Sequence, residues 1–349
     1  MKTTFISTNS ISSATRLALM RMQQALADAQ KEMIDGRYAD VGKTLGFRTV
    51  QTISLRQQHT RLSTIIDTNS VVSTRLDVTQ SALKSLTDSV QDFVGQMQAY
   101  QLDTTKAAEA QADAKSRLDA LLDTMNTAFG NGYIFSGVNT DVKPLTDYFG
   151  TPPSAASQGV ANAFFAEFGI TQSDPAVANI SPADMQTFID TTFADLFDDP
   201  SWSTDWSSAS DQNVRSRIST SELVDTSVNA NEAAFRKLAM AYTMVADLGT
   251  ANLSQTTFEA VIGKAINVAN DAIQGLVSIQ SQVGLIQQRV SDASERISLQ
   301  TDILNKQVKS LEGVDPNEAA TRVNDLLTQM ETSYALTAHI MDLSILDYI

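Results

Sequence analysis

The fold of this chain is decided by residues 55–100, LRQQHTRLSTIIDTNSVVSTRLDVTQSALKSLTDSVQDFVGQMQAY. Steps of three and four residues from Leu55 follow an apolar stripe to Ala128, in which 17 of 22 positions are apolar. A composition of 42% apolar residues would give roughly 9. Because a repeat of 3.5 residues holds one helix face against another helix, we expect a long helix that needs a partner.

The partner lies near the other end of the chain. The same spacing runs from Phe258 to Leu311, where 14 of 16 positions are apolar. A lone amphipathic helix is marginal in water, so the two arms are expected to pair as a rod. The expected rod core comprises Leu62, Ile65, Val72, Leu76, Leu83, Leu86, Val90, Phe93, Val283, Ile286, Val290, Ile297 and Leu304. The polar stripe residues Gln58 and Asn69 are interpreted as register-setting positions.

Proline and aromatic residues set the middle of the chain apart. Six of the seven prolines lie between residues 144 and 200, and the segment 144–206 holds 10 of the 23 aromatic residues. Since proline interrupts helices, we predict a mainly α fold, an elongated heptad-repeat helical rod made from N- and C-terminal arms with a small inserted α+β domain. The predicted domains are terminal helices at 1–40 plus 316–349, a rod at 41–145 plus 230–315, and a solvent-facing insert at 146–229.

Glycines and capping residues predict the helix limits. A first helix is expected at about 12–35, a loop or extended segment at 36–50, and one helix over 51–128 with a kink near Asp103. The run Asp315-Pro316-Asn317-Glu318 is typical of a capping box with proline at the first helical position. A short strand pair is expected between Arg217 and Val228.

The two terminal helices carry narrow stripes and have only each other within the chain. We therefore expect them to be largely disordered in the monomer and to order when other subunits cover them. The expected subunit-interface residues are Leu19, Met22, Leu26, Met33, Val323, Leu327, Met330, Tyr334 and Met341.

No catalytic constellation emerges from the sequence. The run Gly42-Lys43-Thr44 matches the end of a phosphate-binding loop, but Arg37 stands where that loop needs its first glycine. Cysteine is absent and the two histidines are far apart, so we expect no metal, no cofactor and no enzyme. The net charge of −15 argues against nucleic acid. The absence of 18 consecutive apolar residues argues against membrane insertion, and the N-terminus does not match a cleaved secretory signal.

Two clusters in the insert admit more than one interpretation. Trp202 and Trp206 form either a small aromatic core, which we favour, or a platform for carbohydrate. The acidic residues Asp195, Asp198, Asp199 and Asp205 lack the spacing of a calcium loop, and solvated helix ends are favoured over a hard-cation site.

Four stretches carry a resemblance to a known family. They are Ile6-Ser7-Thr8 with Gln23-Gln24, Leu26, Gln30 and Gly36-Arg37; Gly132-Tyr133-Ile134-Phe135-Ser136-Gly137 with Thr140 and Pro144; residues 229–240; and residues 318–321 with Ser333-Tyr334 and 343–349. On these residues the chain resembles the flagellin family, most closely its hook-associated branch at the hook–filament junction. Gly132, Tyr133, Phe135, Ser136 and Gly137 would be the signature of that branch.

The resemblance implies a secreted structural protein of the bacterial flagellum, exported uncleaved through the flagellar type III apparatus. It implies self-association in a ring at the hook–filament junction, between the first hook-associated protein and flagellin, and a flagellar export chaperone as a further partner. The alternative within the family is a flagellin filament subunit. From another class, the alternative is a cell-surface carbohydrate-binding module that uses Trp202 and Trp206.

Overall fold

The computed structural model describes the backbone of residues 8–101 and 103–346 and the side chains of residues 13–101, 103 and 105–339. The helices are α1 Thr8–Asp35, α2 Val41–Leu45, α3 Thr49–Gln101, α4 Ala107–Met125, α5 Ala155–Phe168, α6 Pro182–Phe188, α7 Ala233–Asp247, α8 Gln255–Glu312 and α9 Pro316–Leu346. Two antiparallel hairpins pair β1 Ala128–Phe129 with β2 Gly132–Tyr133, and β3 Arg215–Arg217 with β4 Leu223–Asp225. The predicted mainly α fold with long helices and a small insert is confirmed.

The chain forms two compact units, each built from both arms. The terminal unit contains residues 1–64 and 296–349, and the body unit contains residues 65–295. The terminal unit thus combines a segment from each arm, and the body unit contains the residues between those two segments. The domain limits given above from sequence stay a prediction.

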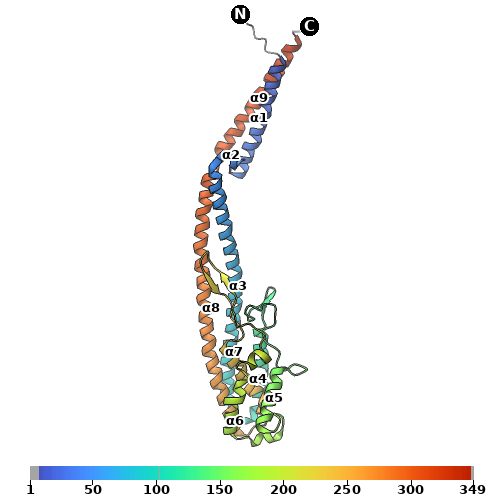
Figure 1. Cartoon of the computed structure of the whole chain (residues 1–349), viewed down its shortest axis with the longest axis vertical. Coiled ribbons are helices and arrows are strands. Elements are labelled where there is room, and N and C mark those ends of the chain that lie inside the picture. The colour runs from blue at the N-terminus through green and yellow to red at the C-terminus, as the bar shows by residue number, and fades with distance from the viewer. Residues whose placement is uncertain (1–7, 102, 347–349) are drawn as a thin grey trace. The chain divides into compact units, whose positions relative to one another are not determined.

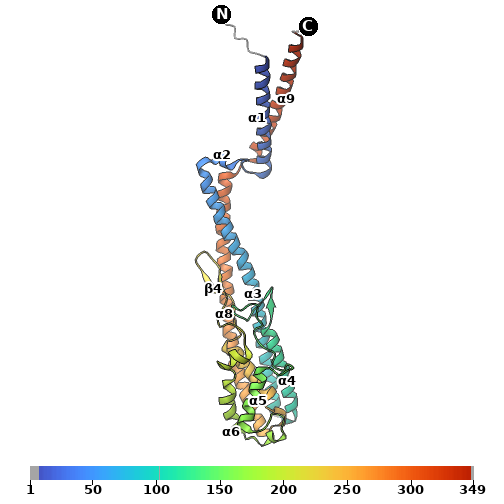
Figure 2. The ribbon, with the colours of Figure 1, turned by 45° about the vertical axis from the view of Figure 1, so that its right-hand side comes forward.

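In the body unit α3 and α8 lie side by side and run antiparallel (Figures 1 and 2). Gln280 Nε2 donates to Thr87 Oγ1 at 2.8 Å, and Gln287 Nε2 donates to Asp77 Oδ1 at 2.7 Å, so polar side chains tie the helices together. The expected rod-core residues that are buried are Leu62, Ile65, Val72, Leu76, Leu83, Leu86, Val90, Phe93, Val283, Val290 and Ile297. Ile286 and Leu304 are half-buried.

The chain reverses direction after α3, and the predicted single helix over 51–128 is wrong. The carboxylate Oδ1 of Asp103 accepts hydrogen bonds from the backbone N–H and the hydroxyl of Thr105, at 3.1 and 2.6 Å. Such local bonds compete with helix continuation. Helix α4 then runs back along α3, where Arg117 Nη1 donates to the Ser89 carbonyl at 2.6 Å. Helix α3 alone has 53 residues and is about 80 Å long.

Helix α7 completes the helical part of the body unit by packing on both α4 and α8. Gln111 Nε2 donates to the Ala246 carbonyl at 3.0 Å, and the rings of Phe93 and Tyr242 meet edge to face at 4.9 Å. Helices α7 and α8 approach closely because Gly275 has no side chain, and a Cβ there would lie 2.7 Å from that of Ala234.

The heptad stripe changes register where α3 begins and where α8 ends. Gln300 and Gln307 were expected in the stripe but are exposed, and Thr301 and Val308 take their places. The buried or half-buried positions then run 290, 293, 297, 301, 304 and 308, which is a spacing of 11 residues over three turns. Gln58 is likewise exposed and bonds Ser54 of its own helix, so its predicted register-setting role is wrong.

Asn69, in contrast, is buried between three chain segments. Its Nδ2 donates to Ser294 Oγ on α8 and to the Ile218 carbonyl, both at 3.0 Å. The β3–β4 hairpin is therefore fastened to the helix pair, and Arg289 of α8 also binds Glu222 of the hairpin at 2.8 Å. The expected strand pair is found at 215–225, starting two residues and ending three residues earlier than predicted.

The insert is built around a buried aromatic cluster. The Trp202 and Trp206 rings stack at 5.5 Å, and Trp206 stacks on Tyr148 at 5.1 Å. Both tryptophans are at most 1% exposed, and Trp202 Nε1 donates to Asn231 Oδ1 at 3.0 Å. The carbohydrate-platform alternative is wrong, because a sugar needs an exposed aromatic face. Of the acidic cluster, Asp199 pairs with Arg236 at 2.9 Å.

Because the insert shares one continuous core with α4 and α7, the body unit is expected to unfold in a single transition. Trp206→Ala should cost about 3–5 kcal/mol, whereas Phe165→Ala, at a residue that is 56% exposed, should cost under about 0.5 kcal/mol. Chemical denaturation of the Trp206→Ala chain, followed by Trp202 fluorescence and by helical circular dichroism, would test this. Fluorescence loss well before helix loss would contradict the shared core.

Candidate functional site

The terminal helices α1 and α9 lie antiparallel in the terminal unit (Figure 1). Apart from Glu32 of α1 and Ala320 of α9, their least exposed residues recur at steps of three and four: Thr15, Leu19, Met22, Leu26 and Ala29 on α1, and Ala319, Val323, Leu326, Met330, Ser333 and Thr337 on α9. Only Ala29, Ala319 and Val323 of these are buried, and the others are partly open to solvent. The two helices thus form a seam that they cover only in part.

The residues expected at a subunit interface divide into two groups. Leu19, Met22, Leu26, Val323 and Met330 lie in the seam between α1 and α9, while Met33, Leu327 and Tyr334 are exposed. The side chain of Met341 lies outside the described residues. Sequence reasoning missed a further exposed apolar set, Leu17, Met20, Ile34 and Leu336. The only signal for them in the sequence is that each is an apolar residue outside the stripe predicted for its helix.

A short joint, made by two segments of the chain that pair with each other, links α1 to the rest of the terminal unit. Tyr38 N donates to the Glu312 carbonyl at 3.0 Å, and Val314 N donates to the Gly36 carbonyl at 3.1 Å. Gly313 is required here, since a Cβ would overlap the Lys309 carbonyl oxygen. Residues 36–38 and residues 312–314 therefore form a minimal antiparallel pair.

Two buried glutamates brace this joint. Glu312 binds Arg56 of α3 through both carboxylate oxygens, with a 2.9 Å bond from Arg56 Nε. That hydrogen bond lowers the pKa of Glu312 below its ordinary value. Glu32 of α1 accepts from the Ala39 backbone at 3.1 Å and from Arg322 of α9 at 2.8 Å. Charged pairs thus join α1 to α9 and α3 to α8.

The start of α9 corrects one detail of the predicted capping box. Asp315 Oδ1 accepts from the Asn317 backbone at 2.8 Å, as an N-cap residue should. Glu318, however, binds Arg322 one turn later at 3.0 Å instead of reaching back to the cap. The predicted helix start at Pro316 is unaffected.

The segment 36–50 is more helical than expected. It contains α2 and a 3₁₀ turn at Gly46–Arg48, and the Asp40 carboxylate caps α2 by accepting from Lys43 N at 2.8 Å. The predicted loop is therefore wrong in this part, because the cap stabilises a helical turn. Thr44 N donates to the Asp40 carbonyl, so this backbone N–H is used inside the helix and is not free to hold a phosphate.

Charge is unevenly divided between the units. Residues 1–64 hold nine Lys and Arg against four Asp and Glu, and residues 296–349 hold four against eight, so the terminal unit is close to neutral. Residues 65–295 hold 12 basic against 28 acidic residues, which is a net charge of −16. Copies of the chain therefore repel one another mainly through their body units.

The Gly-Tyr-Ile-Phe-Ser-Gly segment fills a three-way junction in the body unit. The Phe135 ring is buried edge to face against Phe235 of α7 at 5.6 Å, and its carbonyl accepts from Ala230 N at 2.8 Å. Ser136 O accepts from Ser210 N, and Val138 N donates to the Gln212 carbonyl at 2.9 Å. The segment therefore joins the turn after α4 to the return path into α7.

Each of the two glycines of this segment is required for a different steric reason. Gly137 has φ +63°, and a Cβ there would overlap the carbonyl oxygens of Ser210 and Gln212. Gly132 lies in β2, where a Cβ would press on Thr140 at 3.0 Å. Next to it, the Tyr133 carbonyl accepts from Arg75 Nη2 of α3 at 3.2 Å.

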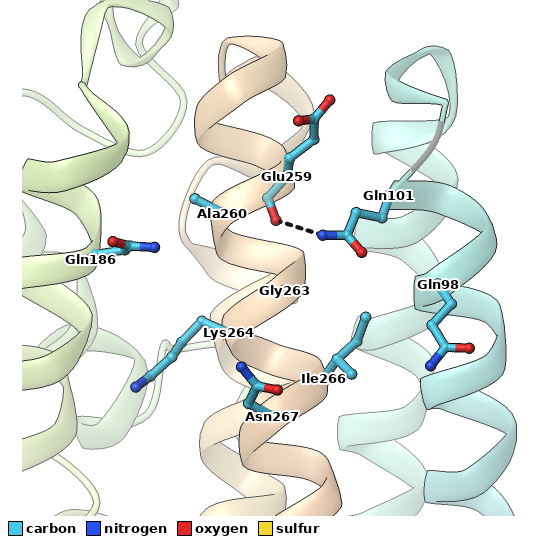
Figure 3. A pocket seen from close by; sticks show the side chains of 9 residues that line it. All are labelled: Gln98, Gln101, Gln186, Glu259, Ala260, Gly263, Lys264, Ile266 and Asn267. Atoms are coloured by element: carbon cyan, nitrogen blue, oxygen red, sulfur yellow. Dashed lines mark hydrogen bonds between the residues drawn. The ribbon is translucent and has the colours of Figure 1, made fainter.

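A groove of about 410 Å³ lies in the body unit between α3, α6 and α8 (Figure 3). Four amides dominate its lining, Gln98, Gln101, Gln186 and Asn267, and Gln101 Nε2 donates to the Glu259 carbonyl at 3.2 Å. Amides neither give up nor take up protons near neutral pH. These amides are suited to hydrogen bonding, and the lining also includes Glu259 and Lys264, of which Lys264 pairs with Asp190.

A hydrogen-bonded pair of buried Tyr148 and half-buried Asp247 was not foreseen from the sequence. The Tyr148 hydroxyl donates to Asp247 Oδ2 at 2.6 Å, and burial raises the pKa of both groups. The bond fastens the first loop of the insert to the end of α7, so its role is structural.

These features define a helical structural protein whose two ends close into one unit with exposed apolar faces. The bacterial flagellin N-terminal helical region matches residues 6–140, and the flagellin C-terminal helical region matches residues 266–349. The chain belongs to the flagellin family, and it is a structural component of the flagellum that is exported for extracellular assembly.

Among solved structures, the chain is similar in fold to one from Vibrio parahaemolyticus that carries a provisional description as a flagellar hook-associated protein. The TM-score is 0.53 and the sequence identity is 10%, over 76% of this chain and 97% of that one. No curated protein matches the chain. In the described part of the chain, every helix is too short or too polar to cross a membrane.

Gly137→Ala is expected to destabilise the body unit more than Gly130→Ala. Both residues have positive φ, which costs a side chain about 1–2 kcal/mol, but only Gly137 has carbonyls in the way. The overlap should add about 1–3 kcal/mol. Denaturant titration of the two variants measures the difference, and equal losses would contradict the close fit of this segment.

Acid should loosen the joint through Glu312. Because the pKa of Glu312 is lowered in the folded chain, the stability contributed by its pair with Arg56 is complete above the ordinary glutamate pKa. It is lost as the pH falls through the lower folded value. Amide exchange of residues 36–39, corrected for intrinsic pH effects, should therefore speed up on acidification. Glu312→Gln should show fast exchange already at neutral pH and a flatter pH dependence, and an identical profile to the parent chain would contradict this role.

Proposed function

We propose that this chain is an adaptor subunit of the hook–filament junction, assembled through its terminal unit. The observation that carries the proposal is the Gly132–Gly137 segment, whose residues resemble the junction branch and whose packing joins three segments of the body unit. The fold similarity to a hook-associated protein is in keeping with it.

The proposed mechanism is mutual burial of apolar surface, without bond chemistry. In a single chain Leu17, Met20, Leu327, Tyr334 and Leu336 remain exposed, and burying each large apolar side chain contributes about 1.5–3 kcal/mol. The near-neutral charge of the terminal unit lets such faces approach one another. Terminal helices of neighbouring copies would then form the inner tube of a ring, and the helices would gain their full order on assembly.

The same faces explain the proposed partners. On one side the ring would contact the first hook-associated protein, and on the other side flagellin, since both present terminal helices of the same kind in this family. Before assembly, an export chaperone would shield the exposed apolar residues. The proposal includes no enzymatic step, no cofactor and no nucleic acid.

The second candidate function is a flagellin filament subunit. The matches to the two flagellin terminal regions favour it as much as the junction. The two functions differ in where the chain sits and how many copies a flagellum holds.

Deletion of the gene separates these functions. For a junction adaptor, cells without it should keep hooks but lack filaments, and should release unpolymerised flagellin, because the filament has no base on which to form. Electron microscopy of wild-type flagella with an antibody against residues 150–210 should show one band near the hook. Label along the whole filament would contradict the junction and favour the filament subunit.

A further inference from the structure

Methionine supplies all of the sulfur in this chain, which has 11 methionines and no cysteine. The five methionines of the body unit are sheltered from solvent. Met240 is half-buried, and four others have no exposed surface. Those four are Met97, Met125, Met185 and Met244. A reagent in solution therefore reaches their sulfur atoms only when the core opens locally.

The methionines described in the terminal unit are at least partly open to solvent. On α1, Met20 is 53% exposed and Met33 is 38% exposed. Met22 of α1 and Met330 of α9 are half-buried in the seam. Met20 lines a surface hollow of about 530 Å³ together with Ser13, Ala14, Arg16 and Leu17. A small molecule can therefore reach the Met20 side chain directly from solvent.

An exposed thioether is a target for peroxides. With hydrogen peroxide, the sulfur lone pair attacks one oxygen, and an S–O bond forms as the O–O bond breaks. The proton on the transferred oxygen moves to the departing oxygen, which leaves as water. The sulfur is oxidised to a sulfoxide and the peroxide is reduced. A methionine sulfoxide reductase with a thiol donor reverses the modification.

Oxidation changes what α1 presents to a neighbouring copy. Met20 and Leu17 belong to the exposed apolar residues that the proposed assembly buries, and Met33 adjoins Ile34, which is 78% exposed. A sulfoxide oxygen is a polar acceptor, and apolar surroundings supply no hydrogen-bond donor for it, so its burial is unfavourable. The oxidised helix is therefore a poorer partner for a second copy.

We infer that Met20 and Met33 are the sites at which peroxides oxidise this chain, and that their oxidation keeps a free copy out of the assembly. Copies that are already assembled are protected, because their neighbours cover both side chains. The inference rests on the proposed assembly function and adds to it a reversible modification and the residues that carry it.

Peptide mass spectrometry of the full-length chain, after a brief exposure to limiting hydrogen peroxide, locates the oxidised sites. Met20 and Met33 should gain an oxygen atom at least about tenfold faster than the fully buried methionines of the body unit, which wait for local opening. As a control, the same treatment in denaturant should oxidise all methionines at similar rates. Oxidation of Met97 or Met244 as fast as that of Met20 in the folded chain would overturn the inference.

Isolated flagella test the protection of assembled copies. Hydrogen peroxide applied to intact flagella should leave Met20 and Met33 of this chain largely unoxidised. Flagella that are disassembled before the treatment should instead give the pattern of the free chain. Equal oxidation of Met20 before and after disassembly would contradict the cover by neighbouring copies.

Matched leucine variants test the effect of oxidation on assembly, since leucine keeps the apolar volume of methionine without its sulfur. Cells that make the chain with Met20→Leu and Met33→Leu should keep their number of filaments in sublethal peroxide, relative to their own untreated culture. Cells with Met97→Leu and Met244→Leu retain both reactive sites and should lose filaments as parent cells do. No loss in parent cells, or equal loss in the two variants, would sink the proposed effect.

The failure of this inference is distinguishable from the failure of the proposed function. If deletion gives hooks without filaments while the variant with Met20→Leu and Met33→Leu stays as sensitive to peroxide as the parent, the effect of oxidation is wrong and the junction role stands. If deletion leaves filaments intact while the free chain shows the expected oxidation pattern, the junction role is wrong and the two reactive sites stand.

Discussion

Every long helix of this chain is amphipathic, and such a helix holds in water only when a second helix covers its apolar stripe. The chain meets this requirement by pairing its beginning with its end, α1 with α9 and α3 with α8. Each of the two compact units consequently contains residues from both arms. Everything between the arms, including the aromatic core around Trp202 and Trp206, is packed onto a helical frame that the arms provide.

Where the arms pass from one element to the next, little space is left for side chains. Gly313 lies against the Lys309 carbonyl, Gly137 lies between two carbonyls, and Gly275 admits Ala234 of α7. Polar groups then complete the fit, with Asn69 holding the β3–β4 hairpin and Glu312 holding Arg56. The apolar stripes thus set which helices pair, and these glycines and buried polar groups set where they pair.

The spacing of apolar residues was enough to predict the mainly α fold and the paired arms, and the run Asp315-Pro316 was enough to predict the start of α9. It was not enough to predict the reversal at Asp103, because the stripe happens to continue in step from Met97 to Ala114 across the turn. The switch from Gln300 to Thr301 was also hidden, since a 3.5-residue pattern cannot register a local 11-residue spacing. At the terminal helices, Val323 and Leu327 are equally apolar neighbours one turn apart, and only the position of α1 decides which faces inward.

The closure of the terminal unit from residues 8–64 and 296–346 has a consequence for the order of events during synthesis and export. Whichever end emerges first, its helices stay without their partners until the last stretch of polypeptide is free. A truncated or stalled molecule therefore never acquires a finished terminal unit. A complete polypeptide is in this way a condition for closing the terminal unit.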